Sequence, residues 1–412
     1  MNSIYIKDRL NKQLYLYITV LIGVDIFGLF FMPKPTPVVL VPFSLYFFVL
    51  NWEKELLFKG YIVAFLIFAF ASCISCYYYR NQPIIESLTC PAFREYYLLL
   101  TYFIYVSLRP KPQQIEKVII VTFAIFFVIY FVQYLVFPRE FVHIIAGRRT
   151  ERIRMIGQIV NSLAFFLSLN RWMLNKGSTN IIVMVCCVFV FFSLGFRAMF
   201  AAVLLSSSIM FFKIRGFDVK KLLAGTFVAL VLGGAFSLTP VAQKGIERMV
   251  KAQETDTYEN EDYIRWIQWE YYLNSHFKSE TERIFGSGQP GYDSVYGREM
   301  NSARDTHIGH VLGGIHDWGL IGQSWVVGPF TIVIFVLMML RCIWISWKSD
   351  NQYFYIASWY IFLILISTTN MEVHRQGSMA YHALIFYLVT ILNHKQWRIR
   401  KIASLLSTLR KV

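Results

Sequence analysis

The chain has 412 residues, of which 56% are hydrophobic, 17% aromatic and only 16% charged, and its formal net charge is +15. Soluble domains carry about 25% charged residues, so this composition excludes an ordinary soluble enzyme. The basic residues follow a membrane-orientation pattern, so their excess does not indicate a nucleic-acid partner.

Long apolar runs recur along the chain, and a run of about 20 residues crosses a hydrocarbon core of roughly 30 Å. Backbone groups in lipid must bond internally, which favours helices, and the runs lack the alternation of a membrane barrel. We therefore predict an all-α polytopic membrane protein with about twelve transmembrane helices and one large extracytoplasmic loop. The predicted spans are 14–31, 37–51, 61–79, 95–108, 115–137, 155–170, 180–195, 197–213, 221–238, 318–340, 353–369 and 377–393.

Two apolar stretches differ from an ordinary single span. Leu14–Phe31 follows basic residues, as a signal peptide does, but no small-residue cleavage site follows it, so it is predicted to be a retained first span. Ile181–Phe212 is almost continuously apolar over 32 residues. As one helix it would be about 48 Å long, which exceeds the core thickness. Gly195-Phe196-Arg197 interrupts it, so two spans joined by a tight turn are predicted.

The distribution of Lys and Arg predicts the orientation, because short cytoplasmic loops are enriched in them. With the N-terminus inside, the inner segments carry 22 of the 40 basic residues, the short outer loops 10 and the long outer loop 8. Both termini are therefore predicted to be cytoplasmic. The predicted parts are helices one to nine at 1–239, the outer loop at 240–306, helices ten to twelve at 307–393 and a cytoplasmic basic tail at 394–412.

Arginines are dense at two places on the side where this rule disfavours them. Arg197 lies at the outer turn between two apolar spans, where an arginine must snorkel to the interface or bind an anion. The outer loop between spans five and six is the second place, and it either contacts lipid head groups or forms an anion site facing the outer leaflet. Its arginines are Arg139, Arg148, Arg149, Arg152 and Arg154.

The large outer loop, 240–306, has a net charge of −4 and is predicted to fold against the outer face. Asp262–Ser275 is predicted to be an amphipathic helix, and Phe285–Gly291 a loop rich in Gly and Pro. A lone glycine-rich stretch is weak support for phosphate binding. The residues expected on the apolar face of the helix are Tyr263, Trp266, Ile267 and Leu273.

Two histidines follow this loop, just before the tenth predicted span. If Asp305 or Thr306 caps a helix, His307 and His310 share a face of it. They are open to three interpretations, as ligands, as a general base, or as ordinary hydrogen-bonded residues. Since no Cys or carboxylate near them has the spacing of a zinc site, we expect no metal and no other cofactor. The six cysteines are expected to be small buried residues.

Two short patterns mark the starts of predicted spans. Arg154-Met155-Ile156-Gly157, followed by Asn161-Ser162-Leu163-Ala164, forms an Arg…Gly…Asn…Ala sequence. Ser193-Leu194-Gly195-Phe196-Arg197-Ala198 forms a turn in which an arginine follows a serine and precedes a small residue.

Two further patterns belong to the large loop and to the span after it. Arg265-Trp266…Trp269, followed by Ile284-Phe285-Gly286-Ser287-Gly288, forms an Arg…Trp…Gly-x-Gly sequence. His307 through Gly319-Leu320-Ile321-Gly322 forms a His…Gly-Leu-x-Gly sequence.

In this order, and on the predicted outer side, the four patterns resemble those of the O-antigen polymerase/ligase family of bacterial envelope polysaccharide assembly, over roughly residues 140–370. Gly-Phe before Arg197 departs from the family pattern. In the last segment the spacing is one residue longer than in the family, and Ile308 stands in place of a small polar residue, which leaves the choice between His307 and His310 open.

The resemblance implies a glycosyltransferase at the outer face of the bacterial inner membrane, generally without a metal. Family members transfer glycans from an undecaprenyl-pyrophosphate carrier. A polymerase adds the growing chain to the next lipid-linked repeat unit of an O-antigen, capsule or exopolysaccharide, and a ligase adds it to a lipid A-core sugar. The expected partners are the lipid-linked donor and acceptor, the bilayer and a chain-length regulator.

The predicted site residues suit this chemistry. Negative charge grows on the pyrophosphate as the glycosidic bond breaks, and a preplaced cation clamp stabilises that transition state. Arginine binds phosphate bidentately and keeps its charge. We expect Arg154, Arg197 and Arg265 to form the clamp, with Arg265 also catalytic. A histidine, His307 or His310, is a suitable base for the acceptor hydroxyl. Further pyrophosphate-binding candidates are Arg149, Arg152 and Arg304.

Two other interpretations remain beside a polymerase and a ligase. A flippase for the same lipid-linked unit would be favoured by a two-fold repeat between 1–200 and 200–412, of which the sequence shows no obvious sign. A purely structural membrane scaffold is disfavoured by the outward arginines.

Overall fold

The structure, a computed structural model, describes residues 2–30, 36–142, 153, 155, 158–194, 197–216, 243, 264–291, 294–302, 318–368 and 372–409. Throughout these residues the regular structure is helical, without a strand, so the predicted all-α class is confirmed. The α-helices are α1 (Asn2–Gly23), α2 (Thr36–Leu50), α3 (Lys59–Arg80), α4 (Ile84–Thr89), α5 (Pro91–Tyr97), α6 (Thr101–Leu108), α7 (Pro112–Val136), α8 (Ile159–Met173), α9 (Thr179–Leu194), α10 (Arg197–Arg215), α13 (Ile264–Asn274), α14 (Glu280–Phe285), α15 (Val295–Ser302), α17 (Gly319–Val327), α18 (Pro329–Lys348), α19 (Phe354–Ile366) and α20 (Ser378–Leu409). Short 3-10 helices occupy η1 (Ile26–Leu29), η2 (Leu98–Leu100), η4 (Asn351–Tyr353) and η5 (Glu372–His374).

Several helices are apolar enough to indicate a membrane protein. In the described chain, four are long and apolar enough to cross a bilayer, namely α3, α7, α18 and the Ala198–Arg215 part of α10. Three shorter apolar helices lie at Val39–Leu50, Thr179–Leu194 and Asn351–Ile366. The count of about twelve spans stays a prediction, and its ninth span, 221–238, lies outside the described residues.

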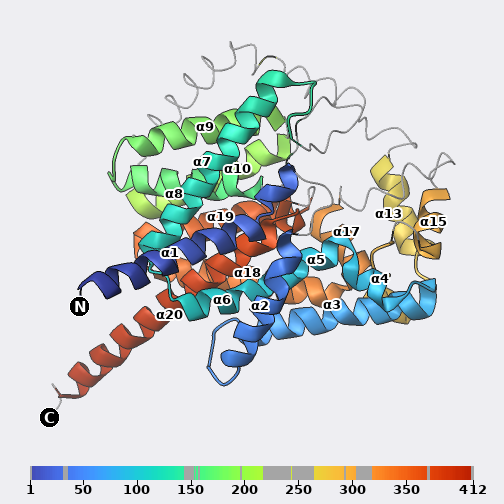
Figure 1. The fold of residues 1–412 in the computed structure, drawn as a ribbon, viewed down its shortest axis with the longest axis horizontal. Helices are drawn as coiled ribbons and strands as arrows, with labels where there is room; N and C mark the ends of the chain where they lie inside the picture. Colours follow the sequence, from blue (N-terminus) through green and yellow to red (C-terminus); the bar gives the residue numbers. More distant parts are fainter. Residues whose placement is uncertain are drawn as a thin grey trace.

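The helices run between two ends of the molecule. Figure 1 shows both termini at one end and α13 and α15 at the opposite end. The first end is rich in Lys and Arg, and we call it the basic end. Polar bonds tie its helix ends together, for example Asn51 Nδ2 to Ser107 Oγ at 2.8 Å and Arg171 to Glu116 at 2.8 Å. The other end, which we call the loop end, carries Arg80.

The core lies around α19 and α20, which are buried on almost every side. Each α19 residue from Phe354 to Tyr360 is buried, as is each α20 residue from Ser378 to Thr390. A helix that is apolar all round must be enclosed by others. Large apolar side chains are exposed instead on the peripheral helices, as at Tyr46, Ile182 and Leu204, which suits contact with lipid.

The tenth predicted span, 318–340, is wrong as a single helix. The stretch forms α17 and α18, which are separated at Gly328. Gly328 has a φ of +81°, and a Cβ there would lie 2.7 Å from the carbonyl oxygen of Ile284. Backbone from the distant α14 therefore fixes the break, and hydropathy carries no signal of it.

Helix α20 runs for 32 residues from Ser378 to Leu409, so it extends past the predicted span 377–393 into the predicted basic tail. All six cysteines are unpaired, and five are buried as predicted while Cys186 is half-buried.

Candidate functional site

Most of the predicted site residues lie outside the described part of the chain. Arg197 is the first residue of α10 and Arg265 the second residue of α13, but their side chains are outside it as well. The chain that flanks both residues is described, and it lies at the loop end. The predicted site residues wholly outside the described residues are Arg149, Arg152, Arg154, Arg304, His307 and His310.

The segments flanking two predicted arginines meet at the hydroxyl of Tyr130, a fully buried residue of α7. This hydroxyl donates to the carbonyl oxygen of Ile153 at 3.5 Å and shares a short hydrogen bond with Ser193 Oγ. Ile153 directly precedes Arg154 in the sequence, and Ser193 lies four residues before Arg197. Two segments 40 residues apart, each holding a predicted clamp arginine, are thereby joined.

The second half of the first pattern serves packing. Asn161 on α8 donates to the carbonyl oxygen of Cys187 on α9 at 3.2 Å. Ser162 accepts from the indole Nε1 of Trp359 on α19 at 3.0 Å. Both side chains are buried, so they hold α8 against its neighbours rather than contact a substrate.

Helix α13, which carries Arg265, packs onto α17 through a tryptophan cluster formed by Trp269, Tyr272, Trp318 and Trp325. The rings of Tyr272 and Trp325 stack with centroids 4.2 Å apart, and those of Trp269 and Trp318 lie 5.1 Å apart. The predicted helix is confirmed over Ile264–Asn274, but Leu273, expected on its apolar face, is 43% exposed. The side chains of Tyr263, Trp266 and Ile267, the other residues expected on that face, lie outside the described residues. Tyr272 takes the buried position because its ring lies flat on Trp325.

The glycine-rich loop between α14 and α15 packs its backbone on the end of α17. Ser287 N donates to Trp325 O and Gly288 N to Val326 O, each at 2.9 Å. Gly286 has a φ of +91°, and a Cβ there would lie 2.3 Å from Val326 O. The predicted loop is therefore confirmed, and its first glycine is required for close backbone approach.

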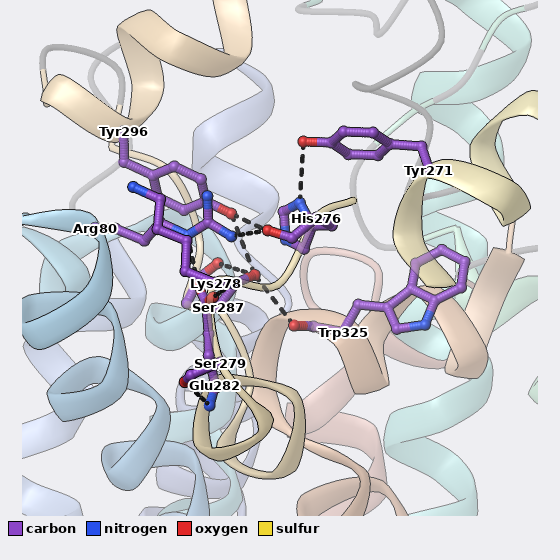
Figure 2. Close-up of polar contacts among 10 residues, drawn as sticks. Arg80, Tyr271, His276, Lys278, Ser279, Glu282, Ser287, Tyr296 and Trp325 are labelled. Carbon is purple, nitrogen blue, oxygen red and sulfur yellow. Dashed lines mark hydrogen bonds and ion pairs between the residues drawn. The ribbon is translucent and has the colours of Figure 1, made fainter. Parts of the chain in front are cut away.

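A buried polar cluster joins the segment that carries α13, α14 and α15, which we call the outer segment after its predicted location, to the end of α3 (Figure 2). Arg80 pairs with Glu282 through a short bond from Nε to Oε1, and its Nη2 donates to the carbonyl oxygen of His276. The guanidinium lies over the ring of Tyr296, 4.9 Å from its centroid. The Tyr296 hydroxyl donates to Ser287 Oγ at 3.1 Å. We call these five residues the Arg80 cluster.

The Arg80 cluster is closed to solvent, and its groups satisfy one another. Arg80 is 5% exposed and Glu282 is fully buried. Burial, and then the neighbouring Arg80 charge, lower the pKa of His276 to about 3, so the ring is neutral. Its Nδ1 lies 3.3 Å from the Tyr271 hydroxyl. A cluster without access for a substrate docks α13–α15 on the membrane helices and does not itself perform chemistry.

Sequence reasoning missed the Arg80 cluster, although one local signal was present. Ser279-Glu280-Thr281-Glu282 has the spacing of a capping box, in which Ser caps a helix and Glu three residues on reaches back. Ser279 Oγ does accept from Glu282 N at 3.1 Å, and Glu282 Oε2 accepts from Lys278 N at 2.6 Å. The second carboxylate oxygen is thereby left for Arg80.

A further set of bonds at the loop end anchors the segment before α20. Gln376 donates to the buried Asp25 at 2.6 Å, and Gly377 N donates to the buried Glu95 at 2.7 Å. Between these anchors and α19, Arg375 Nη1 donates to Gln158 Oε1 at 3.3 Å. Leu320 N of α17 donates to Ser367 O at the end of α19, at 2.8 Å. The helix that receives the tryptophan cluster is therefore tied to the end of α19, and it also contacts η5, which directly precedes Arg375.

The pKa of His276 predicts that docking of the outer segment weakens in acid. A released His276 would have a pKa near 6.5, so it would bind a proton that the docked ring excludes. Docking is therefore most stable above about pH 6.5, and at pH 5 it should be weaker by about 2 kcal/mol. Hydrogen exchange of the 276–288 amides, corrected for intrinsic rates, should increase from pH 7 to pH 5.

The control for this prediction is His276→Gln, which cannot take up a proton in this range. Its 276–288 amides should show little change in corrected exchange between the two pH values. Equal protection of the wild-type segment at pH 7 and pH 5 would contradict the assignment of a neutral buried imidazole.

No family model and no curated protein matches the chain. Across the described ranges, no group of three His, Cys, Asp or Glu residues could hold a metal ion. The fold therefore defines the class, a helical membrane protein with an outer segment docked at one end, and the activity has to be argued from the residues at that end.

Proposed function

We propose that the chain is a membrane glycosyltransferase that polymerises undecaprenyl-pyrophosphate-linked oligosaccharide repeat units of an O-antigen, capsule or exopolysaccharide. The reaction takes place at the outer face of the bacterial inner membrane, with the loop end outside and both termini in the cytoplasm. The donor and acceptor are both lipid-linked, so both reach the site from the bilayer.

Two arrangements support this proposal, and each joins described flanks of two of the four sequence patterns. Tyr130 joins the flanks of Arg154 and Arg197. The tryptophan cluster holds the helix of Arg265 against α17, whose first residues complete the histidine pattern. A site assembled from four distant segments suits a reaction that must hold a diphosphate, a sugar and an acceptor hydroxyl at once.

The chemistry is a single displacement. The acceptor hydroxyl oxygen attacks the anomeric carbon of the donor sugar and loses its proton to His307 or His310. The bond from that carbon to the diphosphate oxygen breaks, and the diphosphate leaves with the electron pair. Arg154, Arg197 and Arg265 stabilise the charge that grows on it. The half-buried rings of Trp269 and Trp318 offer flat apolar faces for sugars.

The test is deletion of the gene in its host, followed by gel display of the surface polysaccharide and by extraction of the lipid-linked glycans. A product limited to one repeat unit, restored to full length by the wild-type gene, is the expected result. Lost attachment with intact lipid-linked polymer would instead identify a ligase. Accumulation of single lipid-linked units on the cytoplasmic side would identify a flippase.

A further inference from the structure

The segment before α20 holds one arginine in a fixed position at the loop end. Its neighbours are anchored on both sides, since His374 is buried, Gln376 bonds to Asp25, and Gly377 bonds to Glu95. Arg375 itself is only partly buried. An arginine whose backbone is already fixed loses little conformational freedom when it binds an anion. This is the property of a preorganised anion site.

Gln158 gives an independent indication of a ligand at this place. Its Oε1 accepts from Arg375, while Nε2 of the same carboxamide is buried without a hydrogen-bond partner, and the residue is only 3% exposed. Buried donors in native proteins are nearly always paired, so an unpaired one calls for a missing acceptor. A second such donor is the Nε of Arg94, next to Glu95.

The position of this pair relates it to the proposed chemistry. Gln158 immediately precedes α8 and follows the segment that contains Ile153 and Met155, whose buried side chains flank Arg154 in the sequence. Tyr130 joins Ile153 to Ser193, near the start of α10. Arg375 therefore reaches this corner from the segment before α20, a part of the chain that none of the four sequence patterns includes.

We propose that Arg375, held by Gln158, binds the diphosphate of the lipid-linked donor as a further member of the cation clamp. The inference rests on the proposed function, because that function supplies the diphosphate. Guanidinium and carboxamide N–H groups side by side match the oxygens of a diphosphate, and a planar arginine fork binds two of them together.

Binding can be measured without activity, on the full chain purified into phosphatidylcholine nanodiscs. The probes are undecaprenyl diphosphate, undecaprenyl monophosphate and inorganic pyrophosphate, and the readouts are Kd and the unfolding temperature of each variant. Arg375→Gln should raise the Kd for the lipid diphosphate about tenfold to a hundredfold. Arg375→Lys should recover only part of this loss, because a lysine keeps the charge and lacks the fork.

Gln158→Met separates binding from stability. It removes the acceptor that orients Arg375 together with the unpaired donor, so the unliganded protein should unfold at an equal or higher temperature while the Kd still rises several-fold. Arg283→Gln, which removes an exposed arginine of α14, is the matched control and should bind as the wild type does.

The possible outcomes test this inference separately from the proposed function. A wild-type protein that binds no undecaprenyl diphosphate overturns both. If Arg375→Gln, Arg375→Lys and Gln158→Met all bind the lipid diphosphate as the wild type does, the role of Arg375 alone is overturned.

The probes also identify the ligand. If the wild type binds the lipid diphosphate but not inorganic pyrophosphate, the bound diphosphate is that of the lipid carrier. If Arg375→Gln loses affinity for both probes equally, the site recognises a diphosphate irrespective of the lipid tail. If Arg375→Gln and Arg283→Gln lose the same affinity for the lipid diphosphate in phosphatidylglycerol nanodiscs, the effect comes from general surface charge, and the role of Arg375 is overturned.

Discussion

Glu282→Gln is expected to release the outer segment from the membrane helices. The change keeps the shape of the side chain and leaves Arg80, 5% exposed, without its counter-charge. Breaking a buried ion pair by removing one partner costs about 3–5 kcal/mol. Hydrogen exchange of the 276–288 amides should therefore accelerate by about 150-fold to 5,000-fold, because local opening limits this exchange.

Two variants test the physical reason for this effect. Glu280→Gln removes a carboxylate of the same helix that pairs with Arg283 at 3.1 Å but is 78% exposed, so exchange should barely change. The double variant Arg80→Met/Glu282→Leu removes both charges and should recover much of the docking that Glu282→Gln loses. Equal exchange in wild type and Glu282→Gln would show that the ion pair does not hold the segment.

Arg197→Ala and Arg265→Ala are expected to abolish most polymer formation at normal protein levels. Removing one preorganised group that stabilises charge in a transition state lowers turnover about 100-fold to 1,000-fold. Each variant, expressed in the deletion strain, should therefore yield mainly single repeat units on a gel. Lysine at either position should restore part of the yield, because it keeps the charge and lacks the bidentate fork.

The histidines are tested in the same strain. Loss of a general base lowers the rate about 100-fold to 10,000-fold, so one of His307→Ala and His310→Ala should fail and the other should retain activity. Arg283→Ala serves as the control, because it lies exposed on α14. Unchanged chain length and yield in both arginine variants would remove the clamp from the mechanism, and full activity in the double histidine variant would place the base elsewhere.

The sequence predicted those features of the fold that depend on local composition. Apolar runs predicted the helices, because burial in lipid and internal backbone bonding act on each run separately. The break at Gly328 was missed although Gly328-Pro329 is a local signal of a helix boundary, whereas the close approach of Ile284, a residue far away in the chain, has no such signal. Leu273 was wrongly placed on the apolar face of α13, where Tyr272 is buried instead. The sequence pattern gave no sign of this, because the stacking partner of Tyr272 lies 53 residues further along the chain.

The site was predictable to the same limited extent. The arginine and histidine patterns were read from short segments, whereas the contact between the flanks of Arg154 and Arg197 depends on Tyr130, a hydroxyl in an apolar helix that no local pattern marks. Arg80 and Glu282 are 202 residues apart, so only the Ser279–Glu282 spacing pointed toward their pairing. Arg375 and its hydrogen-bond partner Gln158 are 217 residues apart, so their contact became apparent only from the structure.

The Arg80–Glu282 pair also limits how this protein can be taken apart or recombined. A soluble fragment of residues 264–302 would contain Glu282 without the Arg80 guanidinium that neutralises it. It would also contain Tyr272 without Trp325, the ring on which Tyr272 stacks. Such a fragment would not keep the native arrangement. A chimera that exchanges this segment with a foreign sequence must therefore import the matching end of α3 and the whole of α17 along with it.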